Sequence, residues 1–514
     1  MKHLFTRTRK GRYARLSVIL TILVIVVTIL ANTVFATLAE RYSWYTQMEK
    51  WGDYQISQSC FTVLDAAMSK AGNDEKIEMI FCDTEKNVLA DSMVSYVYST
   101  AKEIQARYAD RITIHCYDII LNPNTVRRFE KGVNPLTGEE MENELTESSV
   151  ILSRGDYYRV YPLTEFFSFK DNDLSTVWAY NGERKLVSAV MRALDPELPI
   201  VCMTENHGEI YYDYELLQLL DDAGYVISYL DLQTDPIPEN CNLIISYNPN
   251  TDLVEDQVSN SSEAAILNEF LSKDGNSFLL FLESGTPSLP NYEAFIEQWG
   301  ISCQYYHDAE ADKDYRYSVQ NQAQSLTSDG CTIYASAAQE GQAAKLLEGL
   351  DTRVVFQNAT ALTPANGYVS NGDGSYSQLS GNRTLYSLYQ SGKGASSWAN
   401  GALRDGGDAI LMSLTEQKNA TGSSYVGVIA SANFSTEGFL QSAVYENTDV
   451  LFRTLSNVGK TNVPEGLRIK PFQSKDISSV TTAQMLTWTL VLSITPAVIV
   501  TAAAIIVFAK RRRA

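Results

Sequence analysis

Two long apolar runs near opposite ends of the 514-residue chain constrain its fold more than any other feature. Residues 16–39 and 485–509 contain no Asp, Glu, Lys or Arg. At 1.5 Å per residue, each run would form a helix about 36–38 Å long. This exceeds the roughly 30 Å hydrocarbon core of a bilayer. We therefore expect two transmembrane helices, one at each end of a large intervening region.

The flanking charges predict how these two helices are oriented. Residues 1–15 carry six Lys and Arg, residues 510–514 carry four, and neither tail has an acidic residue. Such clusters stay in the cytosol, so both termini are expected there and residues 40–484 outside the cytoplasmic membrane. A cleaved signal peptide is the alternative for the first run, but the apolar region of a signal usually spans only about 7–15 residues. The run length favours an uncleaved anchor.

Composition narrows the function further. The net charge is −20, with 41 basic against 61 acidic residues, which argues against nucleic acid as a partner. Apolar residues make up 45% of the chain, enough for large cores rather than a disordered tail. At about 150 residues per domain, the length suggests roughly three folding units.

The region that follows the first apolar run has the pattern of a βαβ unit. Residues 77–82 and 112–117 are apolar runs typical of buried strands, and residues 92–108 between them have helical periodicity. This order predicts parallel strands with a right-handed crossover. A hairpin is expected around Arg154-Gly155-Asp156, and a helix over residues 181–194.

The alternation restarts more cleanly beyond Asp195-Pro196-Glu197. Strands are expected at residues 199–204, 225–231, 242–247 and 277–283, and helices at 212–223 and 263–273, each ended by Gly. Continuous apolar strands and a Gly just past each helix are typical of a doubly wound α/β domain. The Gly-, Ser- and Asn-rich stretch from 367 to 407 predicts long inserted loops. Strands are expected again at 408–415 and 425–431, with a helix at 449–457.

The sequence therefore predicts an α/β fold with two tandem βαβ-type units, Rossmann-like in pattern, between two transmembrane helices. The expected segments are the tail 1–15, the span 16–39, the first unit 40–196, the second unit 197–458, a linker 459–484, the span 485–509 and the tail 510–514.

One polar motif follows the first strand of the second unit, Thr204 to Glu209 (TENHGE). In open α/β sheets, ligands bind beyond the carboxyl ends of the strands and at helix N-termini. Glu205, Asn206, His207 and Glu209 are therefore candidates for contact with a ligand or partner. A structural turn is the main alternative, and acid/base catalysis by His207 and Glu209 is a weaker one, because no activated nucleophile accompanies them.

Other loops are expected at the same sheet edge. They contribute Asn248, Asn250, Glu283, Ser284 and Asn433. Such amides, hydroxyls and carboxylates suit neutral ligands such as sugars, although they are also ordinary turn residues. The 30 Tyr residues suit wet recognition surfaces.

Several kinds of chemistry lack their sequence signatures. There is no phosphate loop, no H-E-x-x-H, no G-x-S-x-G and no C-x-x-C, so we expect neither a cofactor nor a metal. The seven cysteines are interpreted as mainly buried free thiols, with one disulfide left open.

The second apolar run has a candidate docking face for another helix. Ser493, Ala497 and Thr501 form a stripe of small residues beside Pro496. Small residues are also common in membrane spans generally, so the stripe by itself does not establish a contact.

The order of these features resembles the GldG-like auxiliary subunits of gliding-motility-type ABC transporters. The best local matches are residues 149–166, 201–209, 230–249 and 428–434 with Asn447; residues 367–407 depart most. The resemblance implies an outer sheet similar to class-I glutamine amidotransferases without their Cys nucleophile. It also implies a non-enzymatic subunit that acts with a separate ATPase and a separate multi-span permease.

We therefore expect a membrane-anchored accessory subunit of an ABC-type transport complex, which binds a ligand or partner and contacts membrane lipid. The alternatives are an envelope carbohydrate-binding protein, an enzyme that uses the His207/Glu209 loop, and a structural adhesin or scaffold.

Overall fold

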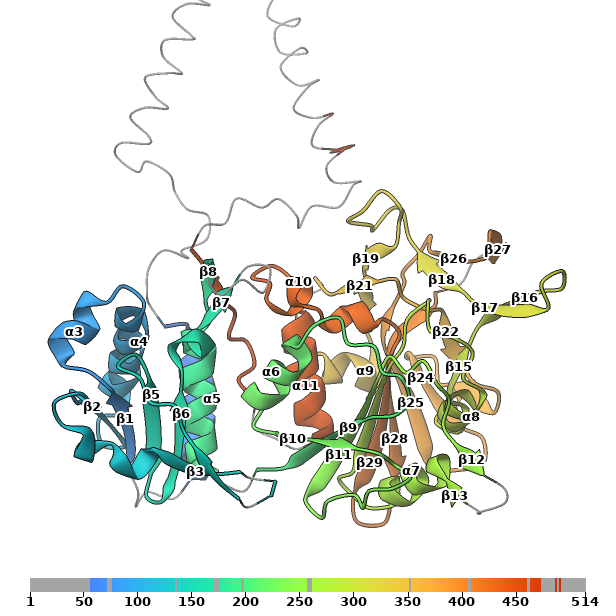
Figure 1. Ribbon diagram of the computed structural model, residues 1–514. Helices are drawn as coiled ribbons and strands as arrows, with labels where there is room; N and C mark the ends of the chain where they lie inside the picture. Colours follow the sequence, from blue (N-terminus) through green and yellow to red (C-terminus); the bar gives the residue numbers. More distant parts are fainter. Residues whose placement is uncertain are drawn as a thin grey trace, which may run out of the picture. The chain divides into compact units, whose positions relative to one another are not determined.

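A computed structural model of the chain is shown in Figure 1. It describes residues 56–71, 76–134, 136–137, 139–169, 176–195, 198–256, 261–350, 353–404, 408–459 and 463–472, together with 486–487 and 490. The chain divides into two compact units, residues 1–53 and 54–514, and all the described residues belong to the second unit.

The two expected spans fall almost entirely outside the described residues. Residues 16–39 lie outside them, as do the docking candidates Ser493, Pro496, Ala497 and Thr501. Within the described ranges, no helix is both long enough and apolar enough to cross a membrane. The two-span arrangement stays a prediction.

The first sheet contains the expected βαβ unit. Strands β1 (Ile77–Phe81) and β2 (Ile112–Cys116) are parallel, with Ile77 opposite Ile112, and the chain between them forms α3 (Glu85–Ala90) and α4 (Val94–Arg107). The hairpin β5 (Val150–Arg154) and β6 (Tyr157–Tyr161) adds antiparallel strands, in the order β2-β1-β5-β6.

Helices α2 (Gln58–Lys70) and α5 (Gly182–Leu194) share the apolar core of this first sheet. Helix α2 begins where Ser57 Oγ accepts a hydrogen bond from the amide of Cys60 at 3.2 Å, an N-cap of the usual kind. Helix α5 is buried on every side. Its apolar face enters the core of the first sheet, so its charged side chains must find partners inside the protein.

Short elements fill the segments between these helices and strands. They are η1 (Pro123–Thr125), η2 (Arg127–Phe129), β3 (Lys131–Val133), β4 (Glu140–Glu142), η3 (Leu163–Phe166), β7 (Phe167–Phe169) and β8 (Val177–Tyr180). Strands β3 and β4 form a hairpin within the polar excursion. Strand β8 pairs on one side with β7 and on the other with β30 (Lys470–Pro471), near the far end of the described chain.

The second sheet is large and has a parallel half and an antiparallel half. The parallel half contains β9 (Ile200–Thr204), β10 (Val226–Leu230), β11 (Cys241–Tyr247), β14 (Ser277–Phe281) and β29 (Ser423–Ile429). The antiparallel half contains β23 (Tyr368–Ser370), β24 (Ser375–Gln378), β25 (Arg383–Gln390) and β28 (Ile410–Lys418). The main path runs β10-β9-β11-β14-β29-β28-β25-β24-β23.

Helices lie on both sides of the parallel half, as expected for a doubly wound arrangement. Figure 1 shows α6 (Glu215–Asp222) and α11 (Asn447–Gly459) on one side and α8 (Pro290–Gln298) on the other, while α7 (Glu263–Leu271) connects β11 to β14. Helix α6 ends at the expected glycine. Gly224 has a φ of 88°, and the amide of Tyr225 donates to the carbonyl of Leu220 at 3.0 Å.

Residues 367–407 contain strands where long inserted loops were expected. Three of them, β23 to β25, extend the main sheet, and two more, β26 (Ser396–Ala399) and β27 (Ala402–Arg404), form a small sheet with β18 (Ser318–Gln320). The loop prediction was wrong because it weighted the turn-forming composition above the apolar residues of β25, where Leu385, Leu388 and Tyr389 are buried.

The rest of the second sheet region is made of short elements. They are β12 (Glu255–Asp256), β13 (Ser261–Ser262), β15 (Ile301–Cys303), β16 (Tyr305–Asp308), β17 (Lys313–Arg316), β19 (Thr332–Tyr334), β20 (Ser336–Ala337), α9 (Gly341–Leu346), β21 (Val355–Gln357), β22 (Leu362–Pro364), η5 (Ala432–Ser435) and α10 (Glu437–Leu440). A single large core of buried apolar side chains underlies this region, and a separate core lies under the first sheet. The described protein is therefore a mixed α/β fold.

Candidate functional site

The carboxyl ends of β9, β11, β14 and β29 form one edge of the second sheet. The backbone joins their loops directly: the amide of Asn248 donates to the carbonyl of Phe281, and the amide of Leu282 donates to the carbonyl of Ile429, both at 2.9 Å. Parallel strands end at the same edge, so the loops that were separated in sequence lie together here.

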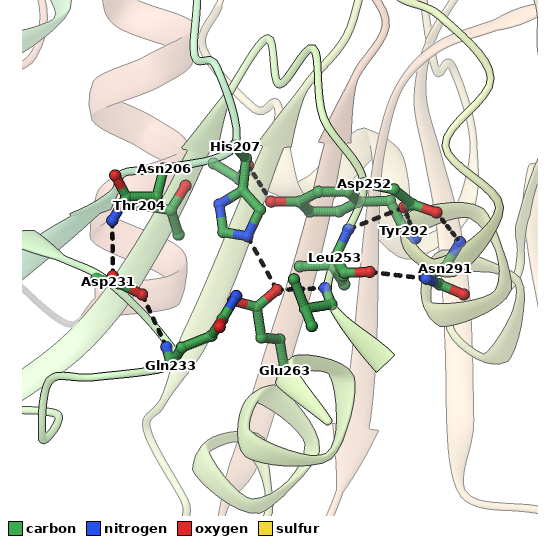
Figure 2. Close-up of polar contacts among 12 residues, drawn as sticks. Thr204, Asn206, His207, Asp231, Gln233, Asp252, Leu253, Glu263, Asn291 and Tyr292 are labelled. Carbon is green, nitrogen blue, oxygen red and sulfur yellow. Dashed lines mark hydrogen bonds and ion pairs between the residues drawn. The ribbon is translucent and has the colours of Figure 1, made fainter. Parts of the chain in front are cut away.

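His207 lies at the centre of one buried polar group at this edge (Figure 2). Its side chain is 3% exposed. The ring Nδ1 is 3.2 Å from Glu209 Oε1, and Nε2 is 3.0 Å from Oε2 of Glu263, the first residue of α7. The ring also meets Tyr292 edge to face, with centroids 5.7 Å apart. Both nitrogens of the imidazole are therefore occupied by carboxylates.

The two carboxylates are themselves held in place. Glu209 Oε1 accepts from the hydroxyl of Thr204 at 2.8 Å, and Oε2 accepts from the amide of His207 at 3.0 Å. Glu263 Oε2 also accepts from the amide of Val254 at 2.6 Å. The group thus ties the turn after β9 to the start of α7.

The charge state of His207 follows from this arrangement. Burial by itself would lower the pKa of the imidazole, but hydrogen bonds and attraction from Glu209 and Glu263 outweigh it and raise the pKa to about 9. Burial would raise the pKa of Glu209, whereas the hydrogen bond to His207 lowers it overall. At neutral pH the ring is an imidazolium that donates from both nitrogens, which leaves no free lone pair for a general base.

A second polar group, closer to the surface, is centred on Glu283 after β14. We call Tyr212, Asn248, Glu283 and Asn433 the Glu283 cluster. Glu283 Oε1 accepts from the hydroxyl of Tyr212 at 2.5 Å and from Asn248 Nδ2 at 3.4 Å, and Oε2 accepts from Asn433 Nδ2 at 3.1 Å. Asn248 Oδ1 in turn accepts from Thr286 at 3.0 Å.

The Glu283 cluster is accessible from outside, since Tyr212 is 45% exposed. Burial and the neighbouring Glu283 carboxylate raise the pKa of the Tyr212 hydroxyl, which therefore stays protonated and able to donate. A carboxylate, two amides and a phenol are groups that can exchange hydrogen bonds with the hydroxyls of a ligand.

The remaining candidates are spread around these two groups. Asn206 is exposed, with a φ of 73°, and its Nδ2 donates to Asp231 at 2.7 Å. Glu205 is exposed, and its amide donates to the carbonyl of Leu230 at 3.1 Å. The amide of Asn250 donates to the carbonyl of His207 at 2.8 Å, and that of Ser284 to the carbonyl of Asn358 at 2.9 Å. Asn206 therefore contacts its neighbours through its side chain, and the other three through their backbone amides.

Sequence reasoning did not identify Glu263 as a residue of the site. Glu263 lies 56 residues beyond His207, and the only signal it carries is a helix start after Ser262, which caps α7. Tyr212 was expected only as one of the 30 tyrosines that suit wet recognition surfaces. Its neighbour Tyr211 has a packing role instead, with its ring stacked on Tyr247 at 5.0 Å.

The structure also places the cysteines and the potential metal ligands. Among the residues that the structure describes, no three His, Cys, Asp or Glu side chains are arranged to hold a metal ion. All seven cysteines are free thiols; five are buried, while Cys116 and Cys331 are partly exposed.

Comparison with known proteins adds little. No protein-family model matches the sequence, and no curated protein matches it. A solved structure of PurLQS from Thermotoga maritima aligns with 51% of this chain and 98% of its own, at 12% identity and a TM-score of 0.22. At that TM-score, the similarity supports no conclusion on fold or function.

Proposed function

We propose that this chain is a membrane-anchored accessory subunit of an ABC-type transport complex, which binds a ligand or partner and leaves ATP hydrolysis and solute passage to separate proteins. Both termini would lie in the cytosol, and the mixed α/β region would lie outside the cytoplasmic membrane. The charge pattern around the two apolar runs motivates this topology.

One structural observation supports it most directly: the two ends of the described region meet at Glu183 on α5. The amide of Ser57 donates to Glu183 Oε1 at 2.9 Å, and Lys470 Nζ lies 2.5 Å from Glu183 Oε2. Phe472 also packs on Phe167, with ring centroids 6.3 Å apart. Ser57 and Lys470, near the two ends of this region, thus lie at one place, an arrangement that suits two anchoring helices in the same bilayer.

The binding role is supported by the Glu283 cluster, which presents hydrogen-bonding groups at an accessible sheet edge. The enzymatic alternative has less support. His207 is buried and bound at both ring nitrogens, so it would have to break at least one carboxylate contact before it could exchange a proton with a substrate.

Protease accessibility tests the topology. Wall-stripped, intact cells would be treated with an impermeant protease, with detergent-lysed cells and a cytosolic marker as controls. The proposal expects cleavage between residues 40 and 484 while the cytosolic marker survives. Protection of that region in intact cells, together with cleavage after lysis, would refute the proposal.

Affinity purification in a mild detergent tests the partnership. A nucleotide-binding subunit with a phosphate-loop motif and a multi-span membrane protein should co-purify in near-stoichiometric amounts. A variant that lacks residues 485–509 should lose both, whereas the surface variant Glu239→Gln should retain both. Recovery of the intact membrane-inserted chain without either partner would point to an adhesin or scaffold.

Carbohydrate binding is the second candidate, because the Glu283 cluster suits hydroxyl-rich ligands. A glycan array probed with the purified chain, and with Glu283→Gln as the matched variant, addresses it. Selective binding that the substitution weakens would support a carbohydrate-binding role, and absence of selective binding would remove it.

A further inference from the structure

A cavity of about 460 Å³ lies apart from the Glu283 cluster. Its walls come from α6, from the start of α5, from β7 with the turn before it, and from residues near α10. This volume falls in the usual range for small-molecule sites. The question is which ligand chemistry its walls would accept.

Most charges in the wall are already paired. Lys185 Nζ lies 2.8 Å from Glu165 Oε2, 3.2 Å from Asp221 Oδ2 and 3.1 Å from Asp222 Oδ1. Arg159 pairs with Asp221 at 2.9 Å. These basic groups are therefore neutralised by their own neighbours and do not require an anionic ligand.

Glu215, on the first turn of α6, is different. It lines the cavity and is partly buried, and it makes no ion pair with another described residue. Its carboxylate accepts a hydrogen bond from the side-chain amide of Gln441. Burial is the main cause that raises the pKa of Glu215 to about 7, with Arg184 opposing and Asp213 and Glu437 reinforcing it. This carboxyl group is attracted by Arg184 but forms no salt bridge with a described residue.

Asn181 supplies an independent observation. It lines the same cavity at the N-terminus of α5, only 9% of its surface is exposed, and its side chain makes no hydrogen bond to another described residue. Oε1 of Gln441, which also lines the cavity, is buried without a partner. Unsatisfied polar groups of this kind are costly to bury. Both free atoms are oxygens that accept hydrogen bonds, so a ligand with N–H donors would satisfy them.

The apolar part of the wall is aromatic. Phe167 and Phe169 line it from β7, and Tyr214 precedes α6 with 72% of its surface exposed. Aromatic rings stabilise organic cations that lie over their faces. We propose that this cavity binds a small organic ammonium ion, with its charge held by Glu215, its N–H groups bonded to the amides of Asn181 and Gln441, and its carbon skeleton against the aromatic wall.

The experiment uses three probes of similar shape and different charge: phenethylammonium, 2-phenylethanol and 3-phenylpropionate. Ligand-observed NMR would measure their binding to the full chain in detergent micelles at pH 8, where Glu215 is ionised. Phenethylammonium should bind, and its affinity should exceed that of the neutral and anionic probes by about tenfold or more.

Two variants assign the binding to the cavity. Glu215→Gln keeps the shape and removes the charge, and should lower the phenethylammonium affinity by at least about tenfold. Asn181→Ala should lower it severalfold. Glu239→Gln, the same charge change at an exposed site outside the cavity, should leave it unchanged. Thermal unfolding of each variant would establish that it is folded.

Equal binding of all three probes, no binding of any, or full affinity in the folded Glu215→Gln variant would overturn the proposal. The outcome is independent of the membrane topology, because the cavity lies wholly within the described region and its test does not require transport partners.

Discussion

His207 allows a quantitative prediction about stability. Its buried imidazolium neutralises Glu209 and Glu263, and replacement by Gln would leave two buried carboxylates without a positive partner. Loss of one partner from a buried ion pair costs about 3–5 kcal/mol. We expect His207→Gln to lower the free energy of unfolding by that amount near pH 6, because the neutral Gln amide can donate hydrogen bonds but cannot neutralise the two carboxylates.

The pH dependence of the unmodified protein gives a second measure of the same interaction. The folded pKa of about 9 lies above the ordinary value of 6.5. Because the folded pKa is raised, the stabilisation is complete below pH 6.5 and is lost as the pH rises through 9. The difference corresponds to about 3 kcal/mol.

Urea unfolding between pH 6 and pH 9.5, followed by fluorescence of tryptophans such as the buried Trp299, would measure both effects. His307 provides the matched control, since its side chain is 58% exposed and His307→Gln should change little. If His207→Gln showed the same stability at pH 6 and the same loss between pH 6.5 and 9 as the parent protein, the ion-pair account of His207 would be wrong.

Three further predictions test other parts of the described region. The pKa of Glu215 is raised from 4.5 to about 7, so its contribution to stability is complete below pH 4.5 and decreases by about 3 kcal/mol as the pH rises through 7. The variant Glu215→Gln should therefore show a flatter dependence of the free energy of unfolding on pH between pH 5 and 8. An unchanged slope in urea unfolding would contradict this. Asp222→Asn should destabilise the protein by about 3–5 kcal/mol in the same assay, because the buried Arg184 and Lys185 lose the carboxylate that they share. A change within about 0.5 kcal/mol, the size expected of an ordinary surface substitution, would argue that these ion pairs do not stabilise the protein. Gly427→Ala should lower the melting temperature, at a cost of about 1–3 kcal/mol in stability, because the new Cβ would lie 2.5 Å from Leu279 Cδ2. Gly438→Ala is the control and should leave the melting temperature unchanged, because the space around Gly438 is open. Equal melting temperatures of the two variants would show that the core adapts to the added methyl group.

The buried parallel strands were the most predictable part of the fold. Continuous apolar runs such as the one that became β14 are long enough to identify a strand buried on both faces, and a glycine after a helix predicts where the helix ends. Strand β25 was missed because its buried apolar residues lie within a stretch whose Gly, Ser and Asn content is typical of loops.

The candidate site was only partly predictable. Asn248, Glu283 and Asn433 were expected at one sheet edge because each follows a strand, and their side chains meet there. That His207 would be enclosed between Glu209 and Glu263 could not be foreseen, since Glu263 comes from a different helix and the sequence contains no signal for that contact.

The sequence by itself determined the local properties of this protein: apolar periodicity, helix ends, acidic composition, and two charge-free runs long enough to span a bilayer. Those properties depend on neighbours along the chain, where the chemistry of a few residues decides the conformation. The tertiary structure decided which carboxylates face His207 and that Glu215, beside the 460 Å³ cavity, has no salt bridge with another described residue. It also brought Ser57 and Lys470 together at Glu183. These contacts depend on packing between segments far apart in sequence. Packing decides whether a carboxylate that leaves water is placed beside a cation or is left without one.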